Sequence, residues 1–454
     1  MFFLKKRLYW DVIVLLIAGV LLYYGSSWQF TQPGVDATIY QCDATAFWQG
    51  SAGLQQLPAA QCAFLHDTGM LDGIVKAMIS DHVPNFIVQI AQYQEHTLAF
   101  HTLPREYPVL ALFVFSAPLL APTQFYQQAY ALWSLLLVFI LYIMIARATS
   151  RRNALFFTAC ITIAGWSTAV SRFDLFPAAC TLAALIFANK GRWGWTYACI
   201  ALGTLLKFYP VLLLPVFLIA EQKSYSLSWQ AWQRWKAVML GFVAVFAGIT
   251  LLSLTISIPG TIGSLQYFAT RPLQIESFPA SLVWLTSHMG FPYHYVYAFV
   301  SINVASRTST AIGTLFTVLW LIGMLTLFWL QWRGKLDLNT ACLTILTLTL
   351  CTGKILSPQY LLWIIPFVAY VRKPTWQWAV FWGVVMVLTY TIYPNVYNAG
   401  FPPPRIIFPL AFTRGLLLSS FVVVIVWQSI ASRGATPNSH SNEDTDRASK
   451  YATV

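Results

Sequence analysis

The chain has 454 residues, of which 58% are hydrophobic, 16% are aromatic and only 9% are charged. A soluble domain usually has about 25% charged residues, so this composition excludes the ordinary soluble classes and favours a polytopic membrane protein. The formal net charge of +12 would suggest nucleic-acid binding in a soluble protein. In a membrane protein it is typical of basic cytosolic loops, and we therefore expect no nucleic-acid partner.

Apolar runs predict an all-α fold with about 12 transmembrane helices. Several of the runs are shorter than the ~20 residues that cross a bilayer, so we expect some broken or buried helices. The first run follows Lys5, Lys6 and Arg7 and ends in aromatic residues, which is more typical of an uncleaved helix than of a signal peptide. The twelve runs are residues 8–28, 124–146, 154–169, 175–188, 194–206, 209–219, 237–256, 309–330, 340–351, 360–371, 376–392 and 406–429.

Fifteen of the 27 Lys and Arg residues form six groups between these runs. The positive-inside rule predicts that all six groups are cytosolic, which fixes the orientation of every span. The groups are Lys5/Lys6/Arg7, Arg147/Arg151/Arg152, Lys190/Arg192, Lys223/Arg234/Lys236, Arg333/Lys335 and Arg372/Lys373.

This topology predicts one membrane domain over residues 1–432 and a disordered cytosolic tail over 433–454. It also predicts a first extracytoplasmic loop at 29–123 and a second at 257–308. The apolar run 107–121 contains two prolines, and counting it as a span would move the Arg147 group outside. We therefore expect it to be a helix on the outer membrane surface.

Two of the seven cysteines, Cys42 and Cys62, share the first outer loop, and the other five lie in apolar runs. If the topology holds, these two face an oxidising space, so we predict a disulfide between them. No Cys/His spacing is typical of a zinc site, and we expect neither a metal nor a cofactor.

Two acidic segments mark the first outer loop. Asp36 lies about eight residues beyond the first apolar run, where a carboxylate can act as a base towards a hydroxyl. Asp43 is a near neighbour with the same possible role, and the alternative for both is a solvated loop aspartate. Glu106 precedes Tyr107 and Pro108, a pattern that also fits a simple helix start.

Three further groups of isolated charges fall on the same predicted side. Arg172 and Asp174 share a very short hairpin. Lys207 and Lys354 stand alone between apolar runs, and two converging cations suit an anionic lipid phosphate. Arg271 is followed by Glu276 in the second outer loop. The alternative for the first group is a structural ion pair or a helix cap, and for the third group it is a surface ion pair. For the second group the alternative is a pair of lysines that reach the interface. Charges at membrane depth usually mark function, and one topology places all of these on one face.

Read in order, these segments resemble membrane glycosyltransferases of the GT-C superfamily, and most closely glycosyltransferase family 87. The likeness runs from the first helix to about residue 366, and the order of the short motifs is its specific part. The sequence has Tyr107-Pro108-Val109 where that family often has Tyr-Pro-Pro, and the segment 62–91 is longer than expected. The motifs are Asp36–Tyr40 with Gly50, Glu106–Pro108, Arg172–Pro177, Lys207–Pro210, Arg271–Ser277 and Ser357–Trp363.

The resemblance implies a GT-C-like fold and transfer of a sugar, with mannose the expected one, from a polyprenyl-phosphate donor to a lipid or glycan acceptor. It implies that Asp36 is the catalytic base of an inverting reaction at the extracytoplasmic face of the cell membrane. The implied donor-site residues are Lys207, Tyr209, Arg271, Glu276, Lys354, Gln359 and Tyr360. The implied supporting residues are Tyr40, Asp43, Glu106, Tyr107, Arg172, Asp174 and Gln274.

Two other functions fit the sequence. One is the same scaffold with a different activity, such as an arabinosyltransferase or a glycan polymerase or ligase. The other is a transporter or flippase, which would place its site near the midplane between repeats. The sequence has no internal repeat and its isolated charges gather at one face, so the transferase is favoured.

Overall fold

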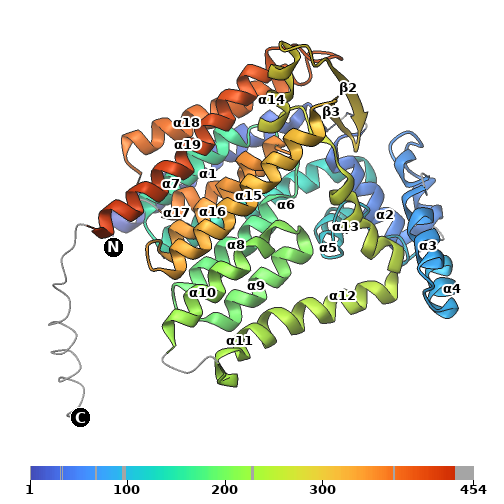
Figure 1. The fold of residues 1–454 in the computed structure, drawn as a ribbon, viewed down its shortest axis with the longest axis horizontal. Helices are drawn as coiled ribbons and strands as arrows, with labels where there is room; N and C mark the ends of the chain where they lie inside the picture. The colour runs from blue at the N-terminus through green and yellow to red at the C-terminus, as the bar shows by residue number, and fades with distance from the viewer. Residues whose placement is uncertain are drawn as a thin grey trace.

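A computed structural model describes residues 2–30, 32, 34–66, 69–94, 99–225, 230–371 and 374–434. Each of the twelve predicted apolar runs contains a helix, and the architecture is that of an all-α polytopic membrane protein (Figure 1). Among the described residues, six helices are long and apolar enough to cross a membrane. The helices within the runs are α1 (Phe2–Ser27), α6 (Tyr126–Ala148), α7 (Arg151–Ala164), α8 (Leu175–Ala188), α9 (Trp193–Leu206), α10 (Leu214–Ser224), α12 (Ala244–Ile256), α15 (Ser309–Trp332), α16 (Leu338–Thr352), α17 (Leu361–Val371), α18 (Trp376–Tyr390) and α19 (Ile407–Gly434).

Some predicted spans are short because they are buried inside the bundle. Helix α17 packs against α7, α8 and α16, and its side chains from Leu361 to Ala369 are all buried. A helix that is apolar on every face needs protein or lipid around it on every side. Here protein fills that role, so α17 need not match the thickness of a bilayer.

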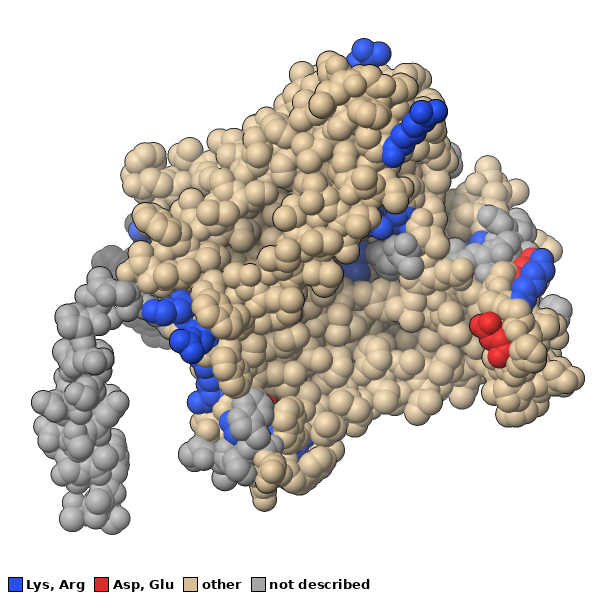
Figure 2. Space-filling model, in the orientation of Figure 1, with Lys and Arg blue, Asp and Glu red and all other residues tan. Residues whose placement is uncertain are grey.

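The ends of the helices that carry the basic groups meet at one end of the bundle. Arg151 forms an ion pair of 2.5 Å with Asp11 of α1. The Lys223 Nζ donates to the Gln331 carbonyl over 2.8 Å, which joins the end of α10 to the end of α15. Figure 2 shows Lys and Arg side chains gathered at the lower left. The group Arg372/Lys373 and most of the predicted tail lie outside the described residues.

The first large loop folds into helices at the other end of the bundle, away from the start of α1 and the end of α19 (Figure 1). They are α2 (Asp36–Leu54), α3 (Gly69–Ser80), α4 (Asn85–Gln94) and α5 (Ala111–Ser116). A disulfide joins Cys42 in α2 to Cys62. Helices α3 and α4 pack against α13 (Ile258–Thr270), so the long segment that the sequence left unassigned covers part of the second loop.

The run 107–121 forms α5 and a following turn rather than one continuous helix. Helix α5 begins at Ala111, whose backbone N–H donates to the Pro108 carbonyl over 3.0 Å in the turn before it. It packs against α2 and buries Ala111 and Phe115, whereas Phe113 is 61% exposed. One buried and one exposed face are the pattern that a helix on a surface requires.

The second large loop contains a small sheet that the sequence did not predict. Strands β1 (Leu273–Gln274), β3 (Ser301–Ser306) and β2 (Tyr293–Ala298) pair antiparallel in that order, beside α14 (Phe278–Ser287). The turn between β2 and β3 is Phe299–Val300, and both residues have positive φ, 56° and 50°. Such a turn usually contains Asn-Gly. The sequence lacks that dipeptide, so the hairpin could not be predicted from it.

Candidate active site

A cavity of about 670 Å³ opens where the two large loops meet the bundle. Its walls come from the start of α2, the segment 271–276, the β2–β3 turn, the segment 357–360 and the segment 393–401. Eight of the residues predicted to belong to the site line it, namely Asp36, Glu106, Arg172, Arg271, Gln274, Glu276, Gln359 and Tyr360.

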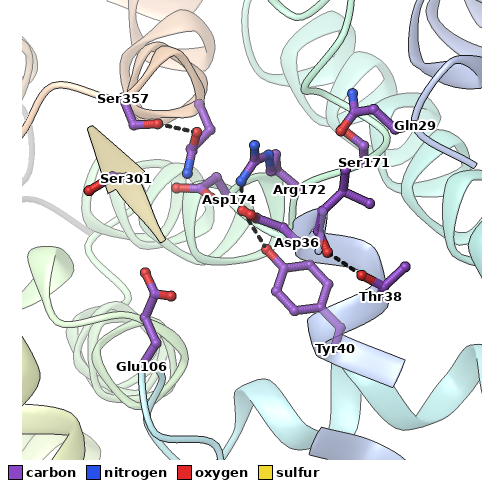
Figure 3. A network of polar contacts seen from close by, with 12 residues as sticks. Gln29, Asp36, Thr38, Tyr40, Glu106, Ser171, Arg172, Asp174, Ser301 and Ser357 are labelled. Carbon is purple, nitrogen blue, oxygen red and sulfur yellow. Dashed lines mark hydrogen bonds and ion pairs between the residues drawn. The ribbon is translucent and has the colours of Figure 1, made fainter. Parts of the chain in front are cut away.

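Asp36 is the first residue of α2, where the positive end of the helix dipole favours a carboxylate. Its Oδ2 forms an ion pair with the Arg172 guanidinium and accepts a hydrogen bond of 3.5 Å from the Tyr40 hydroxyl (Figure 3). The Asp36 and Arg172 side chains are 17% and 12% exposed. Arg172 also donates to the Tyr393 hydroxyl over 3.2 Å. The carboxylate is therefore held in one direction at the cavity wall.

Arg271 places a second guanidinium in the cavity. It lies 3.6 Å from the Glu106 carboxylate. It also donates to the Ser301 hydroxyl over 3.3 Å and to the Phe299 carbonyl over 3.4 Å, so it ties the β2–β3 turn to the cavity. Its Nε is buried and has no hydrogen-bond partner among the described residues. A planar guanidinium with several N–H donors suits a phosphate oxygen.

Glu276 is a buried carboxyl in the same wall and is 1% exposed. Burial raises its pKa to about 7, although the nearby Arg414 and Arg172 guanidiniums act in the opposite direction. Its Oε2 has no hydrogen-bond partner among the described residues. Arg414 fixes the backbone here, because its guanidinium donates to the Glu276 carbonyl over 2.8 Å.

Lys207 and Asp174 do not line the cavity but pair with each other beneath it. The Lys207 Nζ lies 2.7 Å from the Asp174 Oδ1, and both side chains are almost fully buried. The same oxygen accepts a hydrogen bond of 2.6 Å from the Trp363 indole. The Lys207 Nζ also lies 5.0 Å from the centre of the Tyr360 ring. The charge of Lys207 is thus paired with that of Asp174, and the Lys207 side chain supports the cavity wall through Tyr360.

The other predicted site residues also lie outside the cavity lining. Lys354 is exposed, and its carbonyl accepts the backbone N–H of Gln274 over 3.0 Å. Tyr209 stacks on the Trp363 ring at 4.0 Å. Asp43 is 2% exposed, and burial raises its pKa to about 8 despite the Arg105 charge.

Tyr40 and Tyr107 form the aromatic layer behind Asp36. The Tyr40 ring stacks on Phe115 at 4.1 Å and meets Tyr107 edge-on at 5.7 Å. This packing fixes the Tyr40 hydroxyl, which in turn contacts the Asp36 carboxylate. Both tyrosines, which the sequence predicted as supporting residues, therefore lie behind the cavity wall rather than in it.

Sequence reasoning missed the part of the site that comes from the segment between α18 and α19. Tyr393, Tyr397 and Asn398 line the cavity, but nothing in their sequence distinguishes them from ordinary loop residues. Arg414 in α19 is different, because it is a lone cation in an apolar run and is 1% exposed. An isolated charge of that kind is a recognisable functional signal.

Comparison with known proteins gives one match. Neither a curated protein nor a solved structure matches the chain. Residues 106–358, more than half of the chain, match glycosyltransferase family 87. The matched span includes Glu106, Arg172, Arg271 and Glu276 and begins after Asp36. The resemblance seen in the sequence is confirmed, and the chain belongs to glycosyltransferase family 87, which makes it a membrane glycosyltransferase.

Proposed function

We propose that this glycosyltransferase moves mannose from polyprenyl-phosphate mannose to a hydroxyl of a lipid or glycan acceptor, at the extracytoplasmic face of the cell membrane. The observation that carries the proposal is a carboxylate, Asp36, that shares one cavity with two guanidiniums, Arg172 and Arg271. A donor of this kind has an anionic head and an apolar tail. The head suits the two arginines, and the tail suits a site at the end of a membrane bundle.

In the proposed reaction Asp36 is the base. The acceptor oxygen attacks the anomeric carbon while its proton passes to the Asp36 carboxylate. The bond between that carbon and the phosphate oxygen breaks, and its electron pair leaves with the polyprenyl monophosphate. One displacement inverts the anomeric configuration. Charge that develops on the leaving phosphate is stabilised by guanidiniums already in place, which is the arrangement that lowers a barrier most.

The ion pair between Asp36 and Arg172 fits this sequence of events. Before a donor binds, the Arg172 guanidinium holds the Asp36 carboxylate in one direction. An incoming phosphate competes for Arg172 and leaves Asp36 free to accept a proton. Arg271 makes the second phosphate contact, and Glu276 orients it. Gln359 and Tyr360, which also line the cavity, contact the sugar.

The sequence predicted that Lys207 and Lys354 also contact the donor phosphate. The geometry favours different residues for this contact. Lys207 is paired with Asp174 and Lys354 is exposed outside the cavity lining. We therefore assign direct phosphate contact to Arg271 and Arg172, and a supporting role to Lys207.

The test is transfer of radiolabelled mannose in membrane vesicles that contain the expressed chain. Vesicles with the wild-type chain should move label from polyprenyl-phosphate mannose into a lipid or glycan product, and empty-vector vesicles should not. Polyprenyl-phosphate arabinose serves as the competing donor. Transfer of arabinose without mannose would refute the mannose donor, and no transfer from either would refute the polyprenyl-phosphate donor class.

A further inference from the structure

A second groove, of about 660 Å³, lies on the opposite face of α2 from Asp36. Asp36 and Ile39 line the first cavity, whereas Thr38 and Gln41 line the groove. Positions two residues apart on a helix differ by about 200°, so the two sets point in opposite directions. Six glutamines line this groove, which we call the glutamine groove: Gln32, Gln41, Gln56, Gln61, Gln124 and Gln127.

Among the described residues, no charged side chain lines the glutamine groove. An amide has two N–H donors and one carbonyl acceptor, so six amides offer many hydrogen bonds without net charge. Phe30, Leu57 and Pro58 add apolar surface in the same lining. A sugar has this combination, because its hydroxyls both donate and accept and the C–H face of its ring is apolar. The described lining therefore offers no countercharge to a phosphate or another ion.

The glutamine groove adjoins the first cavity. Gln32 lines both, and it precedes Asp36 by four residues. A chain of sugars with one hydroxyl at Asp36 can therefore continue past Gln32 into the groove. The placement is that of a binding site for the part of an acceptor that does not react.

The walls of the glutamine groove are fixed in place before any ligand binds. The Cys42–Cys62 disulfide ties the segment that carries Gln56 and Gln61 to α2. Across the groove, the Gln61 amide donates to the Gln41 Oε1 over 3.0 Å. A preformed groove loses less entropy when a ligand binds.

Several amides in the groove keep capacity for a ligand. The Gln41 amide in turn donates to the Thr123 carbonyl over 2.9 Å, so it is already engaged. Gln56 and Gln124 are exposed at the groove.

We propose that the glutamine groove binds neutral sugar residues of a glycan acceptor and holds that acceptor while its terminal hydroxyl reacts at Asp36. The inference rests on the proposed transferase function, because it makes the groove part of the acceptor site. It narrows the acceptor to one that carries at least two uncharged sugars.

The experiment measures binding rather than turnover. The full chain is placed in phospholipid nanodiscs, free of sugar detergents, and probed by saturation-transfer NMR with mannotriose, maltotriose and cellotriose. The double variant Gln56→Ala/Gln124→Ala removes two exposed amides, so the fold should be unaffected. Gln55→Ala is the matched control, because Gln55 is exposed and adjacent but does not line the groove.

At least one trisaccharide should bind the wild type and the Gln55→Ala control with equal affinity. The double variant should bind it roughly 5-fold to 30-fold more weakly, as expected for one or two lost hydrogen bonds. Equal affinity in all three proteins overturns the proposal, and so does the absence of binding of every probe to the wild type.

Mannose transfer in vesicles separates this proposal from the function on which it rests. Weaker sugar binding in the double variant without any mannose transfer would support the groove and refute the donor. Mannose transfer with unchanged sugar binding in the double variant would support the donor and refute the groove.

Discussion

Replacement of Asp36 by asparagine tests the centre of the proposed chemistry. Asparagine keeps the size of the side chain and one carbonyl oxygen that can accept from Arg172 and Tyr40, but it cannot take up a proton at neutral pH. A general base contributes roughly 10²–10⁴-fold to the rate of such a reaction. The rate of mannose transfer should therefore fall at least about 100-fold.

The fold should survive this change. Asp36→Asn removes a charged partner of Arg172, and the two side chains are 17% and 12% exposed. A hydrogen bond to a charged group contributes about 1.5–3 kcal/mol, which is less than the ~5–15 kcal/mol of a typical folded protein. Arg172 also keeps the Tyr393 hydroxyl as a partner. The loss of transfer can then be attributed to chemistry rather than to unfolding.

The assay is initial-rate transfer of labelled mannose at matched protein levels, with Asp43→Asn as the control. Asp43 is buried and does not line the cavity, so its replacement should leave transfer close to wild type. Near-normal transfer by Asp36→Asn would refute the assignment of the base. If Asp43→Asn alone abolished transfer, the base would move to that residue.

Three other predictions follow from the site and from the first loop. Arg271→Ala should raise the KM for the donor by roughly 10-fold to 150-fold, because a charged contact to the phosphate is lost. Replacement of the exposed Arg307 by alanine should leave this KM unchanged. Equal donor KM values in the two variants would exclude Arg271 from phosphate binding. Burial raises the Glu276 pKa from its usual 4.5 to about 7, so the folded state holds this proton more tightly and stability falls as pH rises between those values. Glu276→Gln should therefore raise the melting temperature at pH 8 and not at pH 5; a gain that is the same at both would contradict the shift. Replacement of Cys42 by serine removes a disulfide between residues 20 positions apart in the sequence. The free energy of unfolding should fall by about 3 kcal/mol. An unchanged denaturation midpoint would show that the disulfide does not stabilise the fold.

The membrane class and the helices could be predicted from the sequence because they follow from local composition. An apolar run in a membrane protein forms a helix, since only internal hydrogen bonds satisfy its backbone away from water. The family could also be recognised, because its short motifs keep their order along the chain and residues 106–358 match it. The β2–β3 hairpin could not be predicted, because Phe299 and Val300 have positive φ without the residues that usually allow it.

The tertiary structure decided which of the isolated charges face the cavity. In the sequence, Lys207 and Arg271 look alike, as lone cations at the predicted outer face. In the fold, Lys207 meets Asp174 at 2.7 Å in a buried pair beneath the cavity, whereas Arg271 lines the cavity 3.6 Å from Glu106, which lines it too. A buried charge needs a countercharge close by, and only the packing of helices far apart in sequence shows where each charge finds one. The sequence by itself therefore determined the class, the helices and the family, and the packing of those helices determined the site.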